Sequence, residues 1–290
     1  MLPEFPTPQA FSMAKSVYKN LVQPAADESV MRYTSLADLV LLLTRNELPL
    51  IRVDMFRDPF EGSIPQSVVN QRLLIQAGRN AQQFQNVIQN HQIRHIQVVT
   101  LGQSPPPWME MVNDVHSELS RKQKARIKST YASCWRCGPE SEGMWRLYCG
   151  EKEGVVLKTT FAKLDYSIKD QDVLAGMIRY GNYKTMAPFD DDFDHVMCKR
   201  EGFNFERELR LLMTDVALYN QILVNESLEP AKVQLLPWSV GETIDQILVS
   251  PYANDLYFEA VRSAVASIDA NKTGLVDRVD WSELQQKPVF

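Results

Sequence analysis

The apolar residues of this chain recur at helical spacing in some segments and at strand-like spacing in others. The two kinds of segment do not alternate regularly, and their order limits the folds that the chain can adopt. Helical patterns occupy residues 36–46, patches within 64–128, and 253–268, and strand-like segments lie between them. Helices that do not alternate strictly with strands are typical of α+β domains. We therefore expect an α+β fold with a mixed, mainly antiparallel sheet. The clearest strand-like segments are 30–35, 48–53, 131–135, 154–161, 176–183, 244–250 and 276–281.

Local signals mark both ends of the first of these helices. Ser35 is a residue type that caps helix N-termini, and Leu36, Leu39 and Leu43 recur behind it at helical spacing. Asn46 is predicted to end the helix.

Composition divides the chain into an appendage and one domain. Residues 1–28 begin with prolines and end in a short helical stretch closed by Pro24, so we expect an N-terminal appendage. Residues 29–290 then form a single domain, and the Gln- and Asn-rich stretch 64–128 is a helical insertion within it. Its two helical patches are separated by Ser-Pro-Pro-Pro at 104–107, and its polarity argues against a second independent core.

Charge and hydropathy narrow the environment and the partners. The first residues lack the basic and apolar regions of a signal peptide, and no uncharged apolar run approaches the ~18 residues of a membrane span. We expect a cytoplasmic protein without a membrane partner. A net charge of -5 is unlike that of a general nucleic-acid binder. Five cations in residues 121–128 form either a solvated helix face or a surface that recognises an acceptor.

Most motifs of known chemistry are absent from the sequence. No phosphate-binding glycine loop and no Gly-x-Ser-x-Gly nucleophile motif occurs. Cys134 and Cys137 have C-x-x-C spacing, but a second close pair is missing, so we expect free thiols and no metal. A metal-dependent nuclease stays open as an alternative because oxygen ligands suit Mg²⁺. Its candidate ligands are Asp190, Asp191, Asp192, Asp194 and His195.

The stretch 204–213, Asn-Phe-Glu-Arg-Glu-Leu-Arg-Leu-Leu-Met, allows two structures. On a strand, Glu206, Glu208 and Arg210 share one face. On a helix, Glu206 and Glu208 point about 200° apart, and the close pair is Glu206 with Arg210. Two carboxylates and a guanidinium on one face would form either a structural charge cluster or a reactive site.

Five short motifs in a fixed order carry a resemblance to a known family. They are Arg-Tyr at 32–33, the loop Arg-Asp-Pro-Phe-Glu at 57–61, Met-Trp-Arg-Leu-Tyr at 144–148, the element 199–210 with Glu-x-Glu-x-Arg, and a late Val-Ser-Pro at 249–251. The chain resembles the prokaryotic domain-of-unknown-function family number twenty-nine seventy-one over roughly residues 30 to 285. Arg57 stands where that family usually has Asn. The resemblance favours the strand for 204–213.

A second resemblance concerns chemistry. An Arg in the first strand, a Ser in a middle strand and a late Glu-x-Glu are similar to the pattern of ADP-ribosyltransferases, which cleave NAD at the nicotinamide bond. The resemblance implies that Arg32 holds the pyrophosphate and that Ser133 supports the nicotinamide ribose. Tyr148 or Trp145 would stack on the nicotinamide ring. Only Tyr-Ala-Ser stands where that group has a Ser-Thr-Ser strand.

The same resemblance assigns roles to the two glutamates. Glu208 would bind a ribose hydroxyl and stabilise the cation-like sugar that forms as nicotinamide leaves. Glu206 would position or deprotonate the acceptor. Tyr33 and Arg210 would complete the cleft.

The sequence thus predicts an NAD-dependent ADP-ribosyltransferase-like enzyme, a toxin or phage-defence effector, that uses NAD as substrate and acts on a protein or nucleic-acid acceptor. An antitoxin or regulatory partner would accompany such a function. The alternative hypothesis is a non-catalytic module that binds a nucleotide or a protein with the same charged residues.

Overall fold

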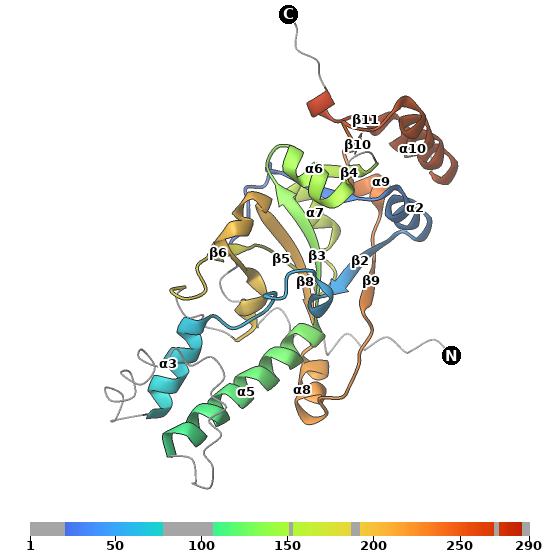
Figure 1. Cartoon of the computed structure of the whole chain (residues 1–290). Helices are drawn as coiled ribbons and strands as arrows, with labels where there is room; N and C mark the ends of the chain where they lie inside the picture. Colours follow the sequence, from blue (N-terminus) through green and yellow to red (C-terminus); the bar gives the residue numbers. More distant parts are fainter. Residues whose placement is uncertain (1–20, 78–106, 151–152, 187–191, 270–272, 286–290) are drawn as a thin grey trace, which may run out of the picture.

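The structure is a computed structural model, and it describes residues 21–77, 107–150, 153–186, 192–269 and 273–285 (Figure 1). As predicted, the described residues adopt an α+β fold around a nine-stranded, mixed, mainly antiparallel sheet. Its strands are β1 (Ser29–Thr34), β2 (Glu47–Arg52), β3 (Thr130–Cys137), β4 (Val155–Thr160), β5 (Leu174–Met177), β8 (Glu208–Thr214), β9 (Val233–Pro237), β10 (Gln246–Val249) and β11 (Val279–Trp281). A separate parallel pair joins β6 (Arg179–Gly181) to β7 (Cys198–Arg200).

The helices cover both faces of the sheet and extend beyond one end of it (Figure 1). The α-helices are α2 (Leu36–Arg45), α3 (Gln66–Ala77), α5 (Pro107–Ser129), α6 (Glu142–Cys149), α7 (Phe161–Ser167), α8 (Val216–Val224), α9 (Val240–Thr243) and α10 (Asp255–Ile268). Short 3₁₀ helices are η2 (Val53–Met55), η4 (Asp192–Met197), η5 (Glu201–Glu206), η6 (Leu275–Arg278) and η7 (Glu283–Gln285).

The predicted ends of the first helix are confirmed. The Ser35 hydroxyl accepts a hydrogen bond from the Asp38 amide at 3.0 Å, which satisfies one of the free N–H groups at the start of α2. Asn46 adopts a left-handed conformation with φ 51° and donates its amide to the Leu42 carbonyl. The chain can therefore turn directly from α2 into β2.

Strand alternation sends neighbouring residues of β1 into different cores. Val30 packs in the large core with α2, α7 and α10, whereas Met31 packs on the other face against Trp145 of α6. This is the period-two pattern of a sheet that is covered on both faces. Most residues that line the candidate site lie on the α6 face.

The sheet forks at β3. Strand β8 pairs with one edge of β3 along its length, from Thr214 opposite Thr130 to Glu208 opposite Arg136. On the other edge, β2 pairs only with residues 131–132 and β1 only with residues 136–137. No described strand pairs with that edge at residues 133–135. An opening is therefore left in the sheet, between the arm that begins with β1 and the arm that begins with β2.

The predicted insertion contributes two described helices, α3 and α5, and its residues 78–106 lie outside the described residues. The two helices pack through a small apolar cluster of their own, although the polarity of the segment argued against a separate core. A few apolar side chains at helical spacing on facing helices are enough to form it. The buried members of the cluster are Val69, Leu73, Val112, Val115 and Leu119.

The described end of the predicted appendage belongs to the body of the domain. Leu21 packs against a small core cluster, and the Val22 carbonyl accepts a hydrogen bond from the Met177 amide at 2.7 Å. The Ala26 carbonyl likewise accepts from the amide of Ala162. Residues 1–20, which make up most of the predicted appendage, lie outside the described residues.

Gly62 lies two residues before the insertion and packs closely against α5. Its φ of +62° is left-handed, and a Cβ atom there would lie 2.4 Å from Cγ2 of Ile127 in α5. We predict that Gly62→Ala lowers the free energy of unfolding by about 2 kcal/mol, because the conformation alone costs an L-residue about 1–2 kcal/mol. Denaturant unfolding measures this. Gly202→Ala, which meets nothing within 4 Å, is the control and should change stability by less than about 0.5 kcal/mol.

Candidate functional site

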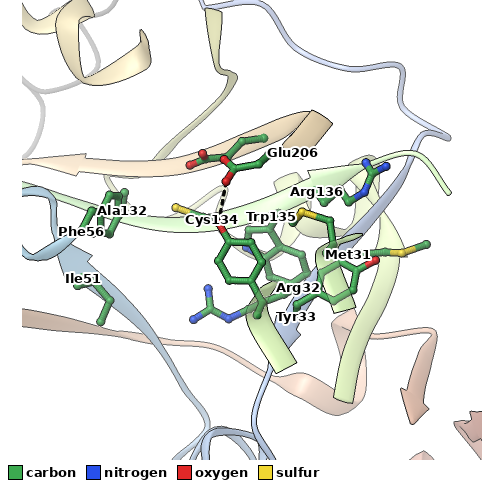
Figure 2. A pocket seen from close by; sticks show the side chains of 13 residues that line it. Met31, Arg32, Tyr33, Ile51, Phe56, Ala132, Cys134, Trp135, Arg136 and Glu206 are labelled. Atoms are coloured by element: carbon green, nitrogen blue, oxygen red, sulfur yellow. Dashed lines mark hydrogen bonds between the residues drawn. The ribbon is translucent and has the colours of Figure 1, made fainter. Parts of the chain in front are cut away.

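A cavity of about 210 Å³ lies at the fork of the sheet (Figure 2). Strands β1, β2, β3 and β8 and helix α6 all contribute to its wall. Its lining combines cations, carboxylates and aromatic rings, which is the mixture that a polar ligand with a flat ring requires. The lining residues that carry charge or a polar aromatic group are Arg32, Tyr33, Trp135, Arg136, Tyr148, Glu206 and Glu208.

Arg32 reaches into the opening between the two arms of the sheet. Its Nη1 donates to the Ser133 hydroxyl at 2.5 Å, and its Nε is buried without a hydrogen-bond partner among the described residues. Burial lowers the pKa of Arg32, with Cys134 and Asp38 opposing the shift. Ser133 is itself fully buried and does not line the cavity, so it positions Arg32.

The stretch 204–213 is only partly a strand. Strand β8 begins at Glu208, while Glu206 is the last residue of the 3₁₀ helix η5. Arg207 between them is left-handed, with φ 44°, so the prediction of one strand carrying Glu206, Glu208 and Arg210 on one face is wrong for Glu206. A left-handed residue breaks the alternation of side chains. Both carboxylates nevertheless turn toward the same lysine.

Lys199 of β7 binds the glutamates together. Its Nζ lies 2.7 Å from Oε2 of Glu206, 2.6 Å from Oε2 of Glu208 and 3.3 Å from Oε1 of Glu61. At most 7 % of each of these four residues is exposed. Charges so deeply buried are stable only when they are paired and hydrogen-bonded.

Arg210 completes this buried charge cluster. Its Nε donates to Oε1 of Glu208 at 2.6 Å, its Nη2 lies 2.9 Å from both oxygens of Glu61, and its Nη1 donates to the Val196 carbonyl at 2.5 Å. Arg210 is fully buried and does not line the cavity. The cluster of Glu61, Glu206, Glu208, Lys199 and Arg210 therefore holds three carboxylates and two cations, an excess of one negative charge.

The cluster sets the ionisation of its members. Burial alone would raise the pKa of Glu208, but Arg210 and Lys199 outweigh it and lower that pKa to about 2. Burial raises the pKa of Glu61, which the same two cations only partly oppose. Burial would lower the pKa of Lys199, but the glutamates raise it well above its usual range. Glu208 is thus an anion at neutral pH, suited to stabilising a cation and unsuited to donating a proton.

The aromatic candidates separate into one at the cavity and one in the core. Tyr148 is 50 % exposed, lines the cavity, and donates its hydroxyl to Oε1 of Glu206 at 3.0 Å, the bond dashed in Figure 2. Trp145 is fully buried, and its Nε1 donates to Glu140. Its indole packs edge-on against Tyr33, with ring centroids 5.1 Å apart. Tyr148 can face a ligand ring, while Trp145 supports Tyr33 from behind.

Three charged residues of the site were not selected from the sequence. In the sequence, Glu61 and Lys199 belong to the motifs at 57–61 and 199–210, and nothing distinguishes Arg136. The usable signal was charge balance, because two buried glutamates and one arginine need a further cation. Asp58 lies in the same loop as Glu61, and its carboxylate accepts from the Phe60 amide at 3.0 Å and fixes the turn.

The described residues give little support to a metal-dependent nuclease. Asp190 and Asp191 lie outside the described residues, and Asp194 and His195 are buried. Burial lowers the pKa of His195 to about 2, so the imidazole is neutral. Within the described ranges, no three His, Cys, Asp or Glu residues are arranged to hold a metal ion.

The cysteines and the basic run have structural surroundings. All four thiols are free, and Cys134 and Cys137, three apart on a strand, point to opposite faces. Burial raises the pKa of Cys137 to about 11, which leaves it protonated. In the run 121–128, the cations pair within the chain or are buried, which weakens the case for a free acceptor surface. Arg121 bonds the Leu223 carbonyl, Lys122 pairs with Glu118, Lys124 with Glu226 and Lys128 with Glu229, and Arg126 is 1 % exposed.

Comparison of the chain with protein-family models, with curated proteins and with solved structures gave no match. The two resemblances noted from the sequence therefore remain predictions. In the part of the chain that the structure describes, no helix has both the length and the apolar character of a membrane span.

Glu208 offers a test of the buried charge cluster. We predict that Glu208→Gln lowers the free energy of unfolding at pH 7 by about 3 kcal/mol, since it leaves Lys199 and Arg210 without their shared carboxylate. Chemical denaturation monitored by circular dichroism measures the loss. Glu259→Gln, which neutralises an exposed carboxylate of α10, should stay within about 0.5 kcal/mol of wild type. An equally small change in Glu208→Gln would show that the cluster does not hold the fold.

The effect of Glu208→Gln on the free energy of unfolding should depend on pH. A carboxyl group with a folded pKa near 2 stabilises the protein above its unfolded pKa of about 4.3 and loses that contribution as the pH falls through its folded pKa. Protonation of Glu61, whose pKa is raised, acts in the opposite direction. The stability difference between wild type and Glu208→Gln should therefore shrink between pH 5 and pH 2. A difference that stays constant over this range would contradict the assigned pKa.

Proposed function

We propose that the protein cleaves NAD between nicotinamide and ribose and transfers the ADP-ribose to an acceptor or to water. The observation that carries the proposal is that one cavity is lined by Arg32, by Tyr148 and by both Glu206 and Glu208. A guanidinium suits a pyrophosphate, an aromatic ring suits nicotinamide, and carboxylates suit a sugar that becomes cation-like.

The electrostatics of the buried charge cluster support this reaction. Its excess negative charge lies beside the cavity, where the positive charge of the sugar would develop as the bond breaks. Because Glu208 is ionised at all physiological pH values, it can stabilise that charge without a prior proton transfer. Arg32 makes no ion pair within 4.0 Å with a carboxylate of the described residues, so it is free to bind a phosphate.

The proposed step balances without any further reagent. The bond from C1′ of the ribose to the pyridine nitrogen breaks, and its electron pair neutralises the nicotinamide ring. An acceptor oxygen or nitrogen then bonds to C1′ and loses its proton to Glu206, which Tyr148 and Lys199 orient. Water as the acceptor gives ADP-ribose.

The size of the cavity limits how NAD can lie in it. A volume of about 210 Å³ is below the ~300–1,000 Å³ of pockets that enclose a drug-sized ligand. It can enclose the nicotinamide riboside end of NAD, and the adenosine end would then lie outside. The proposal therefore requires most of the recognition to come from the reactive end of the dinucleotide.

A second candidate is a module that binds a nucleotide without turning it over. The specific observation in its favour is that Oε1 of Glu208 is held by Arg210 and Oε2 by Lys199. A carboxylate with both oxygens engaged by cations has less charge to offer a sugar. The module would bind NAD at the same residues and release no nicotinamide.

Nicotinamide release from NAD decides between the two. We predict release by wild-type protein and a loss of about a hundredfold or more in Glu208→Gln, the size of effect seen when one electrostatic stabiliser of a transition state is removed. Since Glu208→Gln is also expected to weaken the fold, Tyr148→Phe is a second variant, expected to lose several-fold in release with little loss of stability. Tyr166→Phe, an exposed tyrosine of α7, is the control.

The outcomes are separable by measuring binding beside turnover. Binding of NAD by calorimetry without nicotinamide release would favour the binding module. Unchanged release by Glu208→Gln, in protein shown to be folded by circular dichroism, would remove Glu208 from the mechanism. Absence of both binding and release would reject the NAD site.

A further inference from the structure

Arg136 of β3 is a buried cation that the proposed mechanism does not use. It is 8 % exposed and lines the cavity, and no carboxylate of the described residues lies within 4.0 Å of it. Its Nη1 donates to the carbonyl of the adjacent Cys137 at 2.9 Å, and its Nε is buried without a partner in the described part of the chain. A buried arginine in that state costs stability.

The lack of a partner is unexpected from the register of the sheet. Arg136 lies directly opposite Glu208 in the pairing of β3 with β8, and such cross-strand neighbours have Cβ atoms about 5 Å apart. Opposite charges in these positions normally pair. Here Lys199 and Arg210 hold both oxygens of Glu208, and the guanidinium of Arg136 is left without a carboxylate partner among the described residues.

Arg136 is separate from Arg32. The guanidinium of Arg32 binds Ser133, three residues before Arg136, and three residues of a strand span about 10 Å. Figure 2 shows the two head groups well apart, that of Arg32 on the side of Ile51 and that of Arg136 on the opposite side of the view. A single phosphate therefore cannot satisfy both arginines.

We infer that Arg136 binds a second anionic group of the ligand, a phosphate, distinct from the group held by Arg32. The inference rests on the proposed function for the identity of the dinucleotide, whereas the phosphate site itself does not depend on turnover. The phosphate has two possible sources. It belongs either to the donor, as the additional ribose phosphate of NADP, or to a nucleic-acid acceptor.

Binding of inorganic pyrophosphate tests the site directly. Calorimetry on Arg32→Gln should still detect pyrophosphate, and Arg32→Gln/Arg136→Gln should bind it about tenfold to a hundredfold more weakly, the loss expected for a charge-assisted contact. Arg207→Gln in the same background is the matched control. Arg207 is a neighbouring cation that is half-exposed, pairs with Glu28 at 3.5 Å and does not line the cavity. Equal affinity in Arg32→Gln and the Arg32/Arg136 double variant would overturn the inference.

Thermal stability without ligand gives a readout that does not depend on binding. An arginine kept for a ligand should be dispensable for the fold, so Arg136→Met is expected to keep or raise the melting temperature. A drop of several degrees would assign Arg136 a structural role and overturn the inference. The measurement applies to the full chain and needs no assay of activity.

Two binding comparisons distinguish a phosphate of the donor from a phosphate of the acceptor. If it belongs to the donor, wild-type protein should bind NADP about tenfold or more tightly than NAD, and Arg136→Met should abolish the difference. If it belongs to the acceptor, NAD and NADP should bind alike, and a single-stranded oligonucleotide should displace pyrophosphate from wild type more effectively than from Arg136→Met. Failure of both comparisons would reject a ligand phosphate at Arg136. Pyrophosphate binding that depends on Arg136, found without nicotinamide release, would keep this inference and reject the proposed function.

Discussion

The ammonium group of Lys199, placed among three buried carboxylates, is the interaction on which the site depends. It brings together residues that are distant along the chain: Glu61 before the insertion, Lys199 on β7, and Glu206 and Glu208 on either side of a left-handed residue. Because charges in a low-dielectric interior must be matched, no member can move far alone. The cluster therefore fixes η5, the start of β8 and the loop before α3 against one another.

The fork at β3 explains why this charged cluster lies beside a cavity. If β1 and β2 had continued along β3 until they met, the strand edge at residues 133–135 would be fully paired. The two arms diverge instead, and the gap admits the side chain of Arg32 and a small volume lined by polar and aromatic groups. The chemistry of the site is thus a result of sheet register as much as of residue type.

The sequence was sufficient where the controlling interactions are local. The cap of α2 at Ser35, its end at Asn46 and the strand near residues 30–35 depend on residues within a few positions of each other, and each could be predicted. The α+β class followed from the order of such segments. The glutamates at 206 and 208 are candidates because a strand would place them on one face; Glu206 lies outside the strand, but both carboxylates contact Lys199.

What the sequence did not supply depends on distant contacts. Nothing near Arg207 shows that it is left-handed, and its conformation decides that Glu206 leaves the strand. The roles of Glu61 and Lys199 arise only when four segments meet. The separation of Arg136 from Glu208, its neighbour across the strands, depends on competition from Lys199 and Arg210, which no local pattern encodes.

Helix α5 joins strand β3 directly, and this junction limits how the two can move relative to each other. The helix ends at Ser129 and the strand begins at Thr130, so no loop separates the 23-residue helix from the strand that carries Ser133 and Arg136. A helix of that length extends about 35 Å. Any rotation of the helix about this junction would therefore displace its other end, at Pro107, much further than it displaces Ser129.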